Sequence, residues 1–171
     1  MRIVSVLAPA LIWAGLAVAE TAEAAGPPSI KLAIFPFELE DVSAGAGTIA
    51  ADDIDREQLR LSTEEARRLI AESGRYQLVD VGPVNDPTAK AGNLRNCEGC
   101  EAGIAGGLGA DQSMIGIVAR ISRTEYAVTY TVRDIRSGAI VDTGQTDLRM
   151  GANVAWSRGA RWLIQNRLLA R

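Results

Sequence analysis

The chain has 171 residues and a formal net charge of −3, with 47% hydrophobic and 23% charged residues. This composition is typical of a folded globular protein, and nothing in the charge balance attracts a phosphate backbone, so a nucleic-acid partner is not expected. The chain contains no histidine, which removes the usual general base near neutral pH, the Ser-His and Cys-His nucleophile pairs and histidine-containing metal sites. Most familiar hydrolase mechanisms are thereby excluded, and the sequence indicates no cofactor.

The first 24 residues are predicted to be a secretory signal peptide. Arg2 supplies the positive n-region, residues 3–18 form the apolar segment, and small residues offer cleavage after Ala19 or after Ala24. The apolar segment is shorter than the roughly 20 residues that cross a bilayer, and no later run reaches that length. We therefore expect a linker over residues 25–29 and a periplasmic or secreted protein with no transmembrane segment after cleavage.

The first half of the mature chain begins with a predicted buried strand over residues 30–37, an apolar run interrupted by proline. Residues 38–60 are rich in Gly, Ala and Asp, and we expect a long loop there, with one helical turn near residues 55–61. Ser62 and Glu65 have the spacing of a capping box, which predicts a helix from this point to a stop at Gly74.

The second half continues with a strand over residues 76–81 and a short helix over residues 97–110. Three β-rich runs joined by short turns then predict an antiparallel meander: residues 113–122, 126–133 and 139–148. A closing helix is expected over residues 153–171, with Asn153 as its N-cap.

The predicted element order over residues 30–171 is β-α-β-α-β-β-β-α. This length suits one domain with a substantial core and is too short for two ordinary domains. We therefore predict an α+β fold, an α/β sandwich in which a mixed, mostly antiparallel sheet of about five strands is covered by two or three helices.

Cys97 and Cys100 form a CxxC pair, which leaves several hypotheses open. A thiolate at a helix start has a lowered pKa, which suits redox catalysis. Metal ligation is a second hypothesis, although structural zinc needs two more soft ligands; covalent haem needs a histidine after Cys100, where Glu101 stands. Because an exported protein meets an oxidising compartment, a local structural disulfide is favoured over these and over two free thiols.

A group of acidic residues offers a hypothetical site for a hard cation such as calcium. The spacing does not match an EF-hand loop, so a solvated loop is the favoured interpretation. The residues are Glu38, Glu40, Asp41, Asp52, Asp53 and Asp55.

The closing helix carries Arg158, Arg161 and Arg167 away from a broad apolar face. These arginines are a candidate surface for a partner, and a simple solvated helix face is the alternative. The apolar face comprises Trp156, Ala160, Leu163 and Ile164.

Two family resemblances follow from these motifs. The strand Ala33–Phe37, followed by a loop, a helix and the strand Gly74–Asp80, resembles the opening of the TolB amino-terminal domain and of the periplasmic domain of the curli secretion channel. That resemblance implies an envelope binding or assembly module.

From about Ile30 to its end, the chain more closely resembles a family of small secreted bacterial proteins known as a domain of unknown function. Members are often encoded beside quinoprotein alcohol dehydrogenases and their c-type cytochromes, which implies a periplasmic accessory role and transfers no catalytic residue. The matching features are Cys97–Cys100, Leu108–Asp111, Val132–Asp134 with Ser137–Gly138, Trp156–Gly159 and Asn166–Leu169.

We therefore expect a non-enzymatic periplasmic accessory or protein-binding module that supports a quinoprotein dehydrogenase system, with another envelope protein as its partner. The alternatives are a thiol redox protein that uses Cys97 and Cys100, and a cation-binding protein that uses the acidic loop.

Overall fold

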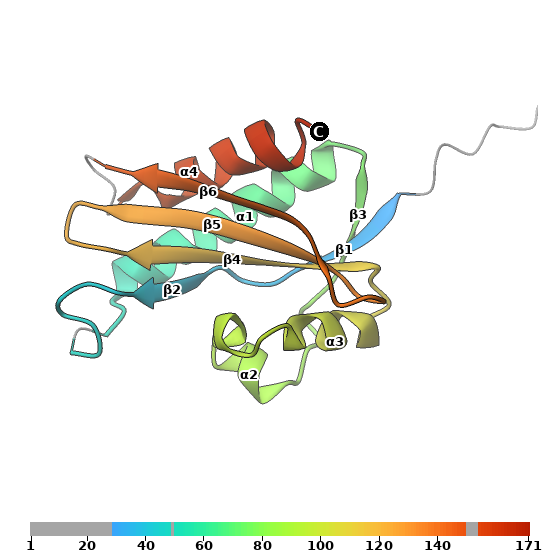
Figure 1. Cartoon of the computed structure of the whole chain (residues 1–171), viewed down its shortest axis with the longest axis horizontal. Helices are drawn as coiled ribbons and strands as arrows, with labels where there is room; N and C mark the ends of the chain where they lie inside the picture. The colour runs from blue at the N-terminus through green and yellow to red at the C-terminus, as the bar shows by residue number, and fades with distance from the viewer. Residues whose placement is uncertain (1–28, 49, 150–153) are drawn as a thin grey trace, which may run out of the picture.

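The computed structural model describes residues 29–48, 50–149 and 154–171. A single sheet lies between two layers of helices (Figure 1): α1 (Asp53–Glu72) and α4 (Trp156–Leu163) cover one face, and the short helices α2 (Pro87–Lys90) and α3 (Cys100–Gly107) lie on the other. The α+β sandwich predicted from the sequence is confirmed. Four helices, rather than two or three, accompany its sheet in the described ranges.

The first strand is interrupted at Pro36, which cannot donate to a β-ladder. The interruption separates β1 (Ile30–Ile34) from β2 (Glu38–Asp41), and both segments pair in parallel with β4 (Gln112–Arg120). On its other edge β1 pairs in parallel with β3 (Tyr76–Val79). One expected strand is therefore two, and the sheet has six strands rather than five.

The antiparallel meander is present as predicted. β4 pairs with β5 (Tyr126–Asp134), with Gln112 opposite Asp134, and β5 pairs with β6 (Ile140–Leu148). Gly138, with φ of +69°, turns the chain between the last two strands, a backbone conformation that favours glycine. The order across the sheet is β3-β1-β4-β5-β6, with β2 extending the β1 side along β4.

Helix α1 begins much earlier than the sequence pattern predicted. Its N-cap is Asp52, whose Oδ1 accepts from the Asp55 amide at 2.8 Å, while Asp55 Oδ2 accepts from the Asp52 amide at 3.2 Å. Ser62 is an interior residue whose hydroxyl donates to the Gln58 carbonyl at 2.7 Å. The prediction of a helix start at Ser62 is thus wrong, and the predicted loop is helical from Asp53 onward. The stop at Gly74, with φ of +69°, is confirmed.

The larger core lies between the sheet and the helices α1 and α4. Trp156 is completely buried there and packs against Tyr126, with ring centroids 5.4 Å apart. The apolar face predicted for the closing helix is buried, and the helix continues as one π-helical segment, η3 (Ile164–Leu168). Other members of this core are Leu32, Ile34, Phe37, Leu69, Ile70, Met114, Val118, Val128, Tyr130 and Val132.

A smaller core lies on the opposite face, under α3 and the 3₁₀ turn η1 (Leu94–Asn96). The central strand β4 contributes to both cores, Met114 to the larger and Ile115 to the smaller. Helix α3 is shorter than the predicted helix over residues 97–110, and Gly109, with φ of +78°, follows it. The buried members of this core are Ala33, Phe35, Leu94, Ala105, Ala110 and Ile115.

Some expectations concern residues outside the described ranges. These are the signal peptide, the linker up to residue 28 and the N-cap at Asn153. In the described residues α4 begins at Trp156, and Ala155 is its N-cap residue. Among the helices that the structure does describe, none is both long and apolar enough to cross a membrane.

Candidate functional site

Cys97 and Cys100 join the end of η1 to the first residue of α3. Their Sγ atoms are at bonding distance and their Cα atoms are 5.4 Å apart. The two residues between them have left-handed backbones, with φ of +53° at Glu98 and +106° at Gly99. A Cβ on Gly99 would lie 3.2 Å from the guanidinium of Arg133, so a glycine suits this turn for both its conformation and its close contact.

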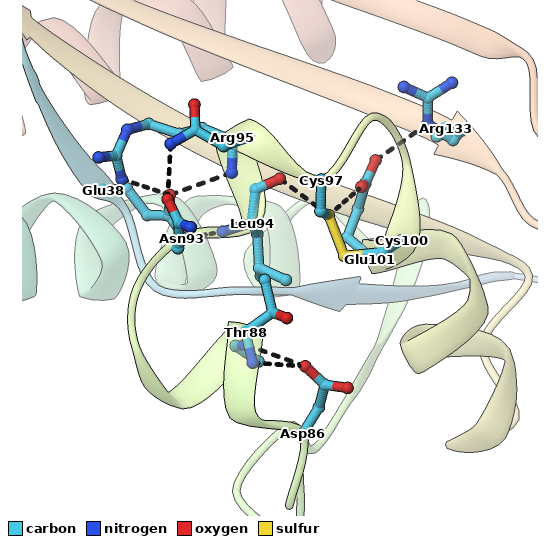
Figure 2. The surroundings of a disulfide bond; sticks show 12 residues. Glu38, Asp86, Thr88, Asn93, Leu94, Arg95, Cys97, Cys100, Glu101 and Arg133 are labelled. Atoms are coloured by element: carbon cyan, nitrogen blue, oxygen red, sulfur yellow. Dashed lines mark hydrogen bonds and ion pairs between the residues drawn. A yellow bond between two sulfur atoms is a disulfide. The ribbon is translucent and has the colours of Figure 1, made fainter.

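Glu101 ties the same turn to the sheet. Its side chain is buried, and Oε1 accepts from Arg133 Nε of β5 at 2.9 Å. Its other oxygen, Oε2, lies 3.9 Å from Cys97 Sγ. Arg133 also donates to the carbonyl of Gly138 at 2.6 Å. Figure 2 shows Glu101 between the disulfide and Arg133.

Glu38 of β2 fixes the other end of this segment and is also buried. Oε1 accepts from the Leu94 amide at 2.7 Å, and Oε2 accepts from the Arg95 amide at 3.1 Å and from its Nη1 at 3.0 Å. The carboxylate therefore satisfies two backbone donors at the start of η1 and pairs with a cation (Figure 2). We call residues 94–101 the clamped segment, since two buried carboxylates and a disulfide hold it.

The chemistry of the clamped segment favours a structural role. A thiolate is the nucleophile and the metal ligand in cysteine chemistry, whereas the sulfurs of Cys97 and Cys100 are bonded to each other. These two residues and Glu101 form the one cluster of possible metal ligands within the described residues.

Five of the six residues of the predicted acidic cation site, all but Glu40, bind arginines or backbone amides. Asp41 and Asp55 both pair with Arg120, and the Asp41 pair measures 3.3 Å. Hydrogen bonds from Ser43 and then the charge of Arg120 hold the pKa of Asp41 below its ordinary value. Asp52 caps α1, and Asp53 pairs with an arginine one turn along that helix. Because arginines and backbone amides bind these five carboxylates, their arrangement does not favour a calcium site.

The three arginines of the predicted partner surface are exposed but have different neighbours. Arg161 Nε donates to Glu65 of α1 at 2.6 Å. Arg167 lies over the ring of Trp162, 6.0 Å from its centroid, and lines a hollow beside β6. Arg158 is exposed near the start of α4. The structure thus does not gather them around one feature.

A set of hollows that the sequence analysis did not anticipate surrounds the break between β1 and β2. Three of them share Arg67 and have volumes of about 300, 310 and 250 Å³. Pro36 lines the first two of these and a fourth of about 260 Å³ that extends toward η1. We call these four hollows together the Pro36 groove. It lies where the parallel strands β1 and β3 end, between α1 and α2.

Arg67 of α1 lies at the meeting point of this groove. Its Nη2 donates to the carbonyl of Ile34, the last residue of β1, at 2.6 Å. Burial lowers the pKa of Arg67, and the charges of Asp80 and Glu64, which lie beyond ion-pairing distance, oppose this effect without reversing it. Within the described residues Arg67 therefore has a carbonyl partner and no carboxylate partner.

Sequence reasoning missed Arg67 and Glu101 as site residues, and it assigned Glu38 to a cation site rather than to its contact with η1 and Arg95. Pro36 carried the one available signal, since a proline between two phenylalanines in an apolar run marks a break in a strand. The three charged residues had no local signal, because their partners are distant in the sequence.

The chain belongs to the family DUF3280, described as "Protein of unknown function (DUF2380)", whose model matches residues 30–168. This confirms the family expected from the motifs. None of the curated proteins matches the chain significantly.

Solved structures share the fold. The LpoB C-terminal domain from Salmonella enterica is 17% identical, with a TM-score of 0.51 over 71% of this chain and 84% of that chain. The same domain from Escherichia coli is 14% identical, with the same TM-score and coverage. TolB from Acinetobacter baumannii matches at 14% identity and a TM-score of 0.46, over 83% of this chain and 29% of that chain. At these identities the likeness concerns the fold alone.

Proposed function

We propose that the mature protein is a non-enzymatic binding module of the bacterial envelope that holds a partner protein at the Pro36 groove. The observation that carries this proposal is the concentration of four hollows around one break in the sheet, with apolar and charged side chains together in their walls. Ligands of sheets with parallel strands commonly bind at the carboxyl ends of those strands, and β1 and β3 both end here.

The roles of the buried carboxylates support a binding module rather than an enzyme. Catalytic acids and bases need a route to a reacting group. Glu38 instead binds Arg95 and two backbone amides of the clamped segment. Glu101 binds Arg133 of β5, and Asp55 binds Arg120. Together with the absence of histidine from the sequence, this leaves these three buried carboxylates in structural roles.

The envelope location rests on the signal-peptide pattern and on the cysteines. Disulfides form and persist in oxidising compartments, and the Cys97–Cys100 pair lies at bonding distance. We propose that the protein acts in the periplasm or after secretion. The family resemblance supports a finer proposal, support of a quinoprotein dehydrogenase system. Deleting the gene should then lower that dehydrogenase activity in periplasmic extracts, and unchanged activity would reject the finer role only.

Photocrosslinking in intact cells tests the binding function. A photoreactive amino acid in place of the exposed Pro36 should yield one discrete crosslinked protein. The matched control position is Arg123, exposed in the turn between β4 and β5 and away from the groove. Crosslinks at neither position, or equal crosslinks at both, would contradict a partner site at the groove.

A further inference from the structure

The geometry points to Arg67 as the anchor for a single carboxylate group of a partner polypeptide, bound in the Pro36 groove beside an apolar side chain. This inference rests on the proposed function and gives it a ligand chemistry. It follows from the donors of Arg67, from the ion pairs that the other arginines of the groove already make, and from the apolar walls.

Arg67 has donors to spare. A guanidinium carries five N–H donors in a planar fork, and within the described residues one side-chain bond is present, from Nη2 to the Ile34 carbonyl. The side chain is half-buried, and a cation that is partly withdrawn from water is stabilised by a counter-charge. A carboxylate matches the fork with two parallel hydrogen bonds and supplies that charge.

Arg67 differs from the other arginines that line the groove, because they already have carboxylate partners. Arg56 pairs with Asp53, Arg60 with Glu57 and Glu64, and Arg95 with Glu38. Asp80 accepts a hydrogen bond from the amide of Gly82 and lies beyond ion-pairing distance of Arg67. Within the described residues, the guanidinium that a ligand carboxylate would find unpaired in the groove is therefore that of Arg67.

The walls beside Arg67 are apolar. Phe37 and Leu59 line the first hollow, and Val84 and Ala89 line the second. Each hollow of about 300 Å³ suits a side chain rather than a large cofactor. One guanidinium with spare donors matches a monoanion better than a phosphate dianion, which recruits several cations. An acidic residue or a chain terminus next to an apolar residue fits both properties.

Nuclear magnetic resonance of the folded, ¹⁵N-labelled mature protein tests the inference. The probes are 3-phenylpropanoate, its neutral amide 3-phenylpropanamide, and inorganic phosphate. The carboxylate should shift the Nε–Hε signal of Arg67 and the amide signals around Ile34 and Phe37, with a Kd on the order of 1 mM for so small a ligand. The neutral amide and phosphate should bind at least about tenfold more weakly, because they lack the charge or the planar match.

A matched pair of variants completes the test. R67Q should weaken the carboxylate response at least about tenfold, and R158Q, which removes an exposed arginine of α4, should leave it unchanged. The Arg67 Nε–Hε signal of the wild-type protein tests the contact directly even where R67Q fails to fold. Three results would each overturn the inference. They are no signal shifts with the carboxylate, equal shifts with the neutral amide, or larger shifts with phosphate. If the NMR test fails while a photoreactive residue at Pro36 still captures one partner, the proposed binding function is retained and the carboxylate anchor at Arg67 is rejected.

Discussion

The ring of Phe37 lies directly over Gly116 of β4, where a Cβ would overlap its Cε1, Cζ and Cδ1 atoms. The backbone amide of Phe37 donates to Thr63 Oγ1 of α1 at 2.8 Å instead of to a β-ladder. Contacts of Phe37 with β4 and with α1 thereby hold the strand break at Pro36 in place. One wall of the groove is consequently a rigid part of the core.

Gly116→Ala should lower the free energy of unfolding by about 1–3 kcal/mol, because the added methyl group displaces the Phe37 ring. Urea denaturation followed by circular dichroism measures this. Gly103→Ala in α3 is the control, since a Cβ added there would meet nothing within 4 Å and alanine favours a helix. A neutral result at Gly116 would mean that the Phe37 ring does not pack there.

Glu38→Ala should cost about 2–3 kcal/mol, because it leaves the amides of Leu94 and Arg95 without their acceptor and removes a buried partner of Arg95. Glu40→Ala, a partly exposed carboxylate on the same strand, should stay within about 0.5 kcal/mol of wild type. Chemical denaturation of both variants tests this. Equal effects would show that the clamped segment does not depend on Glu38.

Replacing Cys97 and Cys100 by serine should cost about 2 kcal/mol, the chain-entropy contribution of a very short disulfide loop, and should leave the fold intact. Thermal unfolding with and without reductant measures the loss. An insulin-reduction assay tests the thiol redox alternative with the same pair of proteins. Catalytic turnover by the wild type that the serine variant lacks would establish a redox function and contradict the structural role.

Lowering the pH should weaken the contact between α1 and α4 through Glu65. The guanidinium of Arg68, and after it that of Arg161, holds the pKa of Glu65 below its ordinary value. The stability from this depressed pKa is complete above the unfolded value, about 4.3, and is lost as the pH falls through the lower folded value. Glu65→Gln should cost no more than about 1 kcal/mol at pH 7. It should also flatten the acid limb of a stability-against-pH curve, whereas Glu98→Gln, in an exposed turn, should not.

Much of the fold was predictable from the sequence because apolar periodicity follows the larger core. The meander and the closing helix place Val128, Tyr130, Trp156 and Leu163 in that core. The start of α1 was hidden because its inward-facing residue in the first turn is Asp55, which pairs with Arg120 of β4. A buried ion pair interrupts the apolar pattern that marks a helix face.

The candidate site was less predictable, because long-range polar contacts build it. The CxxC pair was visible in the sequence, but Glu101 gained its role from Arg133 on another strand. Arg67 resembles any helix-surface arginine in the sequence, and its significance comes from where β1 ends. Such contacts depend on the assembled sheet rather than on local spacing.

Photocrosslinking at the two candidate surfaces distinguishes a partner held at the Pro36 groove from one held by the arginines of α4. Photoreactive residues at Pro36 and Lys90 report on the groove, and one at Arg158 reports on the arginine-bearing helix, with Arg123 as the background position. Both groove positions should crosslink to the same envelope protein in intact cells, and Arg67→Gln should reduce both yields. A partner captured from Arg158 and from neither groove position would contradict a partner site at the groove.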